Sequence, residues 1–183
     1  MPEGFRFAVK VPRTITHFHR LKGVEHELSD FLTECGHLGP KLGPLLVQLP
    51  PTLVFDREIA HDFFQGLRKR FTGHIACEPR HITWFGPETS DFLADFDVAR
   101  VAADPTLVPE AAEPTGADSL VYFRLHGSPR IYYSAYTTDF LEVIRQNLNQ
   151  AVASKAEAWC IFDNTAEGAA YGDALAVLSS FSP

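Results

Sequence analysis

The 183-residue sequence predicts an α/β fold of the (β/α) barrel type, TIM-barrel-like, with about six strand-helix units. Three observations favour this class. Short apolar or alternating segments precede segments in which apolar residues recur at helical spacing. Right-handed crossovers between such segments give parallel strands with helices outside them. Each predicted strand also ends in a polar residue, and barrels carry their catalytic groups at that carboxyl-terminal rim.

Six strands are predicted, over residues 5–12, 42–49, 74–80, 98–104, 120–127 and 159–164. The first alternates, with Phe7 and Val9 on the face opposite Arg6 and Ala8. The second is an almost continuous apolar run closed by two prolines, which is typical of a strand buried on both faces. A parallel sheet follows from this pattern.

Helices are predicted over residues 23–35, 57–71, 89–96, 138–154 and 166–181, where apolar side chains recur at helical spacing. Asp56 is the expected N-cap of the second helix, because its carboxylate can accept hydrogen bonds from the first turn. Residues 105–116 are rich in Pro, Ala and Glu without periodicity and are predicted as a loop.

Charge and composition limit the partners and the compartment. The formal net charge is −7 and the basic residues are scattered, which argues against a broad nucleic-acid surface but allows a local anion pocket. No apolar run approaches the ~18 residues of a membrane span, so we expect no membrane association and a cytoplasmic location. Cys35, Cys77 and Cys160 lie far apart and are predicted to be free thiols, buried in a reducing compartment.

Strand parity predicts which polar side chains meet inside the rim, because side chains two residues apart share a face. Six of the inward side chains are charged or imidazole groups and two are amides. They are Lys10, Gln48, Glu78, Arg80, Asp104, Arg124, His126 and Asn164 at the strand ends, with Ala102 and Phe162 on the same faces as Asp104 and Asn164. A GxGxxG or GK[ST] loop is absent from the sequence, which argues against ordinary nucleotide binding.

Five motifs in order resemble the YecE-like family, also called domain of unknown function 72. They are Phe5–Lys10 with Thr16–His17, Leu42–Pro44 through Gln48–Pro51, Glu78–His81 with Trp84, Arg124–Gly127 with Tyr132, and Phe162–Thr165. The resemblance covers nearly the whole chain. It implies a TIM-barrel-like fold and no established activity.

Members of that family usually begin about sixty residues earlier, which is roughly two strand-helix units of a barrel. We therefore expect residues 1–183 to form one domain that is truncated at its N-terminus relative to the family. An incomplete barrel leaves two unpaired edges, and such edges tend to pair with another chain. A homo-oligomer formed through the open edges is one expectation, and an open sheet is the other.

Glu78, Asp104 and His126 are the candidate catalytic residues. Glu78 inside a barrel would act as a general acid or base, with Asp104 as a second carboxylate or His126 as its partner. The alternative for Glu78 is a buried ion pair with Arg80 or Arg124, and for Asp104 a cap or turn before Pro105. Both readings stay open on the sequence.

The candidate ligand-binding residues are Lys10, Gln48, Arg80, Arg124, Tyr132 and Asn164. Converging guanidinium groups suit a phosphate or carboxylate, and aromatic residues suit a sugar or base, although core packing is their commoner role. Glu78, His81, Asp104 and His126 would suit a divalent cation, but no HxH, HExxH or CxxC spacing supports one. We therefore predict no metal and no other cofactor.

Two functions from different classes are consistent with these residues. The first is a hydrolase or isomerase that acts on a small anionic, phosphorylated or sugar-like substrate at the rim. The second is a non-catalytic ligand-binding or scaffold protein, including a nucleic-acid-associated one, although the charge makes nucleic acid the less favoured partner. The fold cannot choose between them, because barrels support many unrelated reactions.

Overall fold

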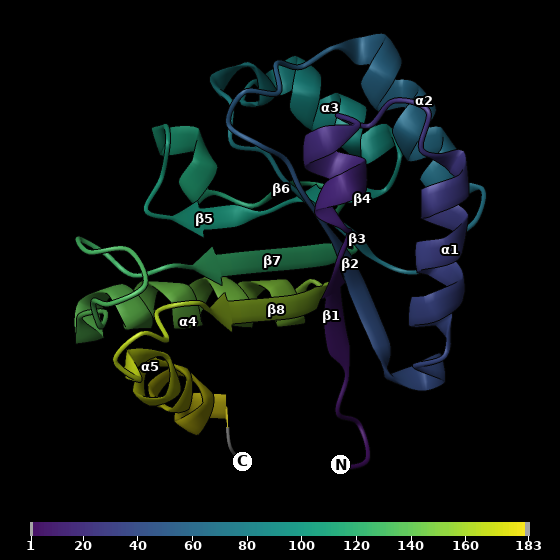
Figure 1. Cartoon of the computed structure of the whole chain (residues 1–183). Coiled ribbons are helices and arrows are strands. Elements are labelled where there is room, and N and C mark those ends of the chain that lie inside the picture. Colours follow the sequence, from purple (N-terminus) through teal and green to yellow (C-terminus); the bar gives the residue numbers. More distant parts are fainter. Residues whose placement is uncertain (1, 182–183) are drawn as a thin grey trace.

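The computed structural model describes residues 2–181, which form two sheets covered by helices on their outer faces (Figure 1). The first sheet has the order β1-β2-β3-β4-β6 and the second the order β5-β7-β8. The strands are β1 (Phe7–Lys10), β2 (Leu42–Gln48), β3 (Ile75–Glu78), β4 (Val98–Arg100), β5 (Ala102–Asp104), β6 (Thr115–Gly116), β7 (Leu120–Leu125) and β8 (Glu157–Phe162). All paired strands are parallel except β4 and β6, which are antiparallel.

The chain passes from the first sheet to the second at Val101. β4 pairs with β3, whereas β5 pairs with β7, and the backbone N–H of Val101 donates to the carbonyl of Cys77 at 2.8 Å. The single strand predicted over residues 98–104 is therefore two strands that share one extended segment. This crossing brings the carboxyl ends of both sheets toward one rim.

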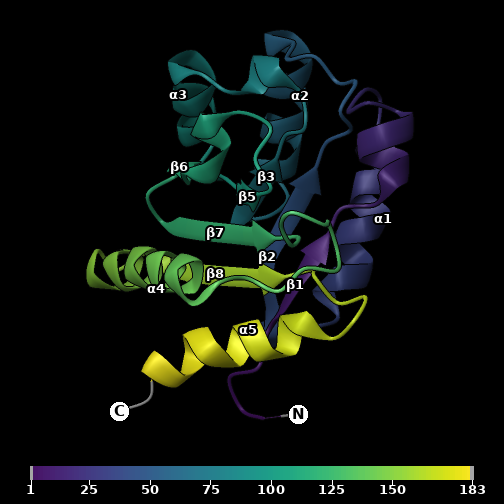
Figure 2. The same ribbon diagram turned by 90° about the vertical axis from the view of Figure 1, so that its left-hand side faces the viewer.

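Within residues 2–181, five α-helices each follow a strand, close to the predicted positions. They are α1 (Glu25–Gly36), α2 (Arg57–Arg68), α3 (Pro87–Asp95), α4 (Thr138–Ala153) and α5 (Ala169–Leu178). The first three cover the β1-to-β4 sheet, and α4 and α5 cover β7 and β8 (Figures 1 and 2). Asp56 caps α2 as predicted, because its side chain accepts from the N–H groups of Glu58 and Ile59.

Three groups of buried side chains account for the packing. The largest lies between α1 to α3 and the first sheet and includes Phe63, Phe64 and Leu67 of α2. A second lies on the inner faces of the strands, around Leu46, Ala76 and Tyr122. The third lies between α4, α5 and the second sheet. Hydrophobic burial thus packs the helices against the outer faces of the sheets, and the inner faces of the two sheets pack against each other.

The α/β class, with parallel sheets and outer helices, is confirmed, whereas a closed barrel is not seen. Within residues 2–181 the strand order ends at β1 on one side and at β8 on the other. The amino-terminal ends of these edge regions still meet through side chains. Arg6 pairs with Glu157 at 2.9 Å, and the guanidinium of Arg6 lies 5.6 Å from the ring of Trp159.

The predicted parity was wrong for two strands. Ala102 and Phe162 pack with the helix-facing cluster, whereas Val101, Trp159 and Ile161 belong to the inner one. In Val98 to Asp104 the polar residues Arg100 and Asp104 share a face with Ala102, but that face lies on the helical side, where buried Arg100 donates to the carbonyl of Glu110. The last strand carries aromatic residues on both faces, so its sequence does not distinguish an inner face from an outer one.

Smaller differences concern the loop and the thiols. Residues 105–116, predicted as an irregular loop, contain a short 3-10 helix, Pro109–Ala112, and the strand β6. All three cysteines are free, with Cys35 and Cys77 buried as predicted and Cys160 half-buried. Among the described residues, no helix is long and apolar enough to cross a membrane.

Candidate functional site

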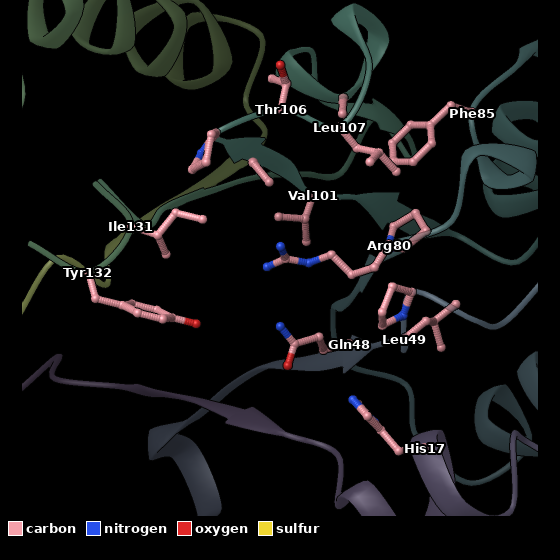
Figure 3. Close-up of a pocket in the computed structure, with 15 residues that line it drawn as sticks. His17, Gln48, Leu49, Arg80, Phe85, Val101, Thr106, Leu107, Ile131 and Tyr132 are labelled. Atoms are coloured by element: carbon pink, nitrogen blue, oxygen red, sulfur yellow. The ribbon is translucent and has the colours of Figure 1, made fainter. Parts of the chain in front are cut away.

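A cavity of about 390 Å³ opens at the carboxyl-terminal rim, where the two sheets face each other (Figure 3). It is lined by fifteen residues from the strand ends and the loops that follow them. They are His17, Gln48, Leu49, Pro51, Pro79, Arg80, Phe85, Val101, Ala103, Pro105, Thr106, Leu107, Ala111, Ile131 and Tyr132. Gln48, Arg80 and Tyr132 are the predicted ligand-binding residues that the fold brings into this cavity.

Glu78 lies beneath the cavity, at the end of β3, and is 1% exposed. Arg124 donates from Nη1 to its Oε2 atom at 2.7 Å, and Arg80 donates to Oε1. The Nε2 atom of His126 lies 3.4 Å from the same Oε1 atom. Both carboxylate oxygens therefore contact cationic or imidazole groups, one from the same strand end and two from the end of β7.

These contacts determine the ionisation of Glu78. Burial alone would raise the pKa of its carboxyl, because desolvation disfavours the charged form. The hydrogen bond with His126 and the charges of Arg80 and Arg124 outweigh burial and lower the pKa to about 2. Glu78 is therefore ionised at neutral pH, which suits a structural ion pair better than proton transfer.

Asp163, immediately after β8, completes the charged cluster and was missed by the sequence reasoning. Its Oδ2 atom lies 2.5 Å from Nη2 of Arg124 and 3.3 Å from Nδ1 of His126. Asp163 was missed because the inner face of the last strand was assigned to Phe162. In the structure the inner face carries Ile161, and Asp163 shares that face. The motif Phe162–Asp163–Asn164 was a signal that could have identified it.

His126 follows β7 and is 2% exposed. Burial would lower the pKa of its imidazole, but the carboxylates of Asp163 and Glu78 raise it overall. Nη2 of Arg80 lies 2.8 Å from Nε2 of His126. A guanidinium can only donate, so Nε2 accepts from Arg80 when the imidazole is neutral, whereas protonated His126 can donate from Nε2 to Glu78 and from Nδ1 to Asp163.

Arg80 joins the charged cluster to the cavity. Its side chain is 31% exposed, and its guanidinium extends across the cavity between Gln48 and Val101 (Figure 3). Its buried Nε–H has no hydrogen-bond partner among the described residues. Because Nε is enclosed by protein and Nη2 contacts Glu78 and His126, a ligand in the cavity would meet the Nη1 end of the guanidinium.

His17, in the π-helical turn Thr14–Phe18, lines the cavity and was not among the predicted site residues. Its Nδ1 atom lies 2.8 Å from the hydroxyl of Thr16. Burial and then the charges of Arg13 and Lys10 lower the pKa of its imidazole, so His17 is neutral at pH 7. From its sequence position His17 was expected only in the connection after the first strand, because the turn itself has no clear pattern.

Three predicted ligand-binding residues, Lys10, Arg124 and Asn164, do not line the cavity, although Arg124 belongs to the charged cluster beneath it. Lys10 ends the edge strand β1 and is exposed. Asn164 is fully buried and donates from Nδ2 to the carbonyl of Ser134 at 2.9 Å and to Asp173 at 2.7 Å. Asn164 therefore anchors the loop after β7 to α5.

Asp104 ends β5 on the face toward α4, not toward the cavity. Burial raises the pKa of its carboxyl, and its buried Oδ1 atom has no hydrogen-bond partner among the described residues. With Glu78 and His126 also beneath the surface, none of the three predicted catalytic residues lines the cavity. Their catalytic roles stay predictions. Glu78 and His126 contact Arg80, which lines the cavity, whereas Asp104 faces α4.

Metal ligands are not gathered at this rim in the part of the chain that the structure describes. Groups of three or more His, Cys, Asp or Glu side chains that would hold an ion do not occur among residues 2–181. His81, one of the residues considered for such a site, instead accepts from the N–H of Thr83 at 3.3 Å.

The fold and site define a class of protein: parallel α/β sheets with helices outside and a cavity at the carboxyl rim above a buried ion-pair cluster. The family described as "Protein of unknown function DUF72" matches residues 1–182. The chain therefore belongs to the DUF72 family. This confirms the resemblance found in the sequence.

Solved structures support the same relationship. A DUF72 family protein from Thermotoga maritima is 24% identical with a TM-score of 0.85, and the match covers 99% of this chain and 75% of that one. A DUF72 family protein from Enterococcus faecalis is 25% identical with a TM-score of 0.79, covering 99% of this chain and 80% of that one. A search of curated proteins found no significant match.

Proposed function

We propose that the rim cavity binds a small anionic ligand and that Arg80 is its principal contact. The observation that carries this proposal is the position of Arg80, whose guanidinium extends into the cavity and whose side chain is 31% exposed there. Guanidinium groups bind carboxylates and phosphates through paired, charge-assisted hydrogen bonds. Gln48 and Tyr132 lie beside it as further hydrogen-bonding groups.

The charges beneath the cavity support an anion rather than a cation. Glu78 and Asp163 are balanced by Arg80 and Arg124, and His126 adds a positive charge when it is protonated. The raised pKa of His126 brings that charge closer to neutral pH. Lys10 and Arg13 act on His17 and make the same side of the rim positive.

Titration of the protein with inorganic phosphate and with acetate, followed by NMR chemical shifts, tests this proposal. We expect shifts at residues around Arg80 that saturate and that Arg80→Gln abolishes. The matched control is Arg57→Gln, which removes an exposed arginine paired with Glu88 on the helical side. Equal shifts in wild type and Arg80→Gln would refute the proposal.

A second candidate is acid/base catalysis by a hydrolase or isomerase on an anionic substrate. The observation that favours it is His17, a neutral imidazole that lines the same cavity as Arg80. A neutral imidazole can act as a general base near pH 7. In this reading Glu78 and His126 position Arg80, while His17 takes or returns the proton.

A panel of phosphoesters and sugar phosphates, assayed with wild type, His17→Gln, Glu78→Gln and Arg124→Ala, separates catalysis from binding. Catalysis predicts turnover in wild type that each variant reduces. Binding without turnover in any substrate supports the non-catalytic ligand-binding or scaffold function. Association with nucleic acid remains the less favoured form of that function, given the net charge of −7.

We also propose that the two sheets form an incomplete TIM-barrel-like arc and that a homo-oligomer forms through its open edges. Support comes from the parallel strand order and from β1 and β8, which lack a second neighbour within residues 2–181. Sedimentation velocity over a range of concentrations tests the assembly. We expect a dimer or larger species, and a monomer at every concentration would contradict it.

A further inference from the structure

The cavity has two chemically different walls. Ten of its fifteen lining residues are apolar, whereas the polar ones are His17, Gln48, Arg80, Thr106 and Tyr132. In Figure 3, Gln48, His17 and Leu49 lie on one side of the Arg80 guanidinium, and the mainly apolar group Val101, Leu107, Phe85 and Thr106 lies on the other. A ligand in this cavity would therefore meet a cation on one side and hydrocarbon on the other.

The apolar wall is open to the cavity rather than filled by the protein itself. Leu107 is 57% exposed and Ile131 is 47% exposed, although both are large aliphatic side chains. They come from two different loops, the one after β5 and the one after β7. Exposed apolar side chains that converge on a cavity indicate a surface that a ligand covers.

Tyr132 is held over the cavity by a backbone that few side chains adopt. Its φ is 70°, in the left-handed region that is uncommon for a residue with a side chain. Its N–H donates to the carbonyl of His126 at 2.6 Å, and its carbonyl accepts from the N–H of Ala166 at 3.0 Å. The strained position turns the aromatic ring and hydroxyl toward Arg80 (Figure 3).

From these features we infer that the cavity takes a monoanionic carboxylate with an aromatic or otherwise apolar body, and not a polyhydroxylated sugar or sugar acid. The inference rests on the proposed anion binding and specifies its ligand class. Arg80 is the permanently charged side chain among the described lining residues, and because its Nη2 atom already contacts Glu78 and His126, its remaining Nη1 donors suit a single carboxylate. The hydroxyls of a sugar placed against Leu107 and Ile131 would lose water without gaining partners.

Three probes of similar size test this inference by isothermal titration calorimetry. Naphthoate has the carboxylate and the apolar body, naphthamide has the same body without charge, and gluconate has the carboxylate on a hydroxylated chain. We expect naphthoate to bind at least about tenfold more tightly than either of the others. Comparable affinity for gluconate, or equal affinity for naphthamide, would overturn the inference.

Two variants test whether the apolar wall contributes to binding. Leu107→Ser should weaken naphthoate severalfold and leave gluconate unchanged, because it removes apolar surface alone. Leu175→Ser is the control, since Leu175 is 45% exposed on α5 and outside the cavity lining. Equal effects of Leu107→Ser and Leu175→Ser would contradict the apolar wall. Leu107 is exposed, so its replacement does not depend on repacking a core.

Arg80→Met separates this inference from the anion proposal on which it rests. Should gluconate or glucose phosphate bind in an Arg80-dependent way while naphthoate does not, anion binding stands and the apolar ligand class falls. Should none of these probes, nor inorganic phosphate, show Arg80-dependent binding, both fall. Thermal unfolding of Arg80→Met establishes that the variant is folded, and Leu107→Ser gives the independent answer if it is not.

Discussion

At the residue scale, the buried ion pairs around Glu78 illustrate how one carboxylate can organise a rim without touching a ligand. Its two oxygens contact Arg80, Arg124 and His126, which come from two different strand ends. Buried ion pairs contribute little net stability when intact, because desolvation offsets their attraction. Removing one partner is costly, since the remaining charges stay buried.

We predict that Glu78→Gln lowers the free energy of unfolding by about 3 kcal/mol or more, because it leaves Arg80 and Arg124 short of a counter-charge. Urea unfolding measures the change. Glu88→Gln is the matched control, since Glu88 is 77% exposed and pairs with Arg57 at 3.3 Å, and we expect it to cost roughly 0–1 kcal/mol. Equal costs for the two variants would show that burial of the cluster does not matter.

The pH dependence of stability follows from the two shifted groups. Glu78 has a lowered folded pKa, so its contribution is present above the ordinary value of 4.5 and is lost as the pH falls toward about 2. His126 has a raised folded pKa, so its contribution is present below 6.5 and is lost as the pH rises through the higher folded value.

We therefore predict that wild type loses more stability than His126→Gln as the pH is raised from below 6.5 to beyond the folded pKa of His126. Urea unfolding at a series of pH values provides the comparison. Glu78 and Asp163 remain ionised throughout this range because both have lowered pKa values, so they do not contribute to the difference. Parallel pH profiles for the two proteins would contradict the prediction.

At the element scale, helix boundaries follow from local chemistry. α2 begins where Asp56, in an extended conformation, accepts hydrogen bonds from two N–H groups of the first turn. Its buried face carries Phe63, Phe64 and Leu67, and its charged residues face outward. The alternation of apolar and charged residues thus gave both the start of this helix and the direction it faces.

We predict that Asp56→Ala destabilises the protein by about 0.5–2 kcal/mol, through loss of the N-cap. Asp62→Ala is the matched control on the same helix, because Asp62 is 85% exposed and has only a surface contact with His61. Chemical denaturation compares the two. A cost for Asp62→Ala as large as that for Asp56→Ala would indicate a general effect of charge on α2 instead of capping.

At the scale of the whole molecule, Trp159 links the two sheets across the inner space. Its indole is stacked with Tyr122 at 6.4 Å and lies against Gly43 near the start of β2. A Cβ atom at Gly43 would lie 2.7 Å from the Trp159 ring and 2.9 Å from the carbonyl of Phe7. Glycine at this position is therefore required by the approach of the second sheet.

We predict that Gly43→Ala destabilises the protein by about 1–3 kcal/mol, because the added methyl group overpacks this junction. Gly36→Ala is the control, since nothing lies within 4 Å of a Cβ at the end of α1, and we expect it to be neutral or stabilising by up to about 1 kcal/mol. Thermal unfolding distinguishes the two. Equal stability of both variants would show that the sheets do not pack through Trp159.

By itself the sequence determined the alternation of strands and helices, the α/β class, the capping of α2 and the resemblance to the family. It also determined that Gln48, Arg80 and Tyr132 lie at the rim. These features depend on periodicity, capping chemistry and order along the chain, which are local properties.

Only the tertiary structure decided which side chains meet. The split of one predicted strand at Val101, the inward direction of Asp163 and the entry of His17 into the cavity depend on contacts between distant segments. Alternation along a strand does not say which face is inside when both faces are apolar. Glu78, the strongest catalytic candidate in the sequence, also depends on distant contacts, because Arg124 and His126 from the end of β7 enclose its carboxylate. Arg80, two residues later, reaches the cavity instead.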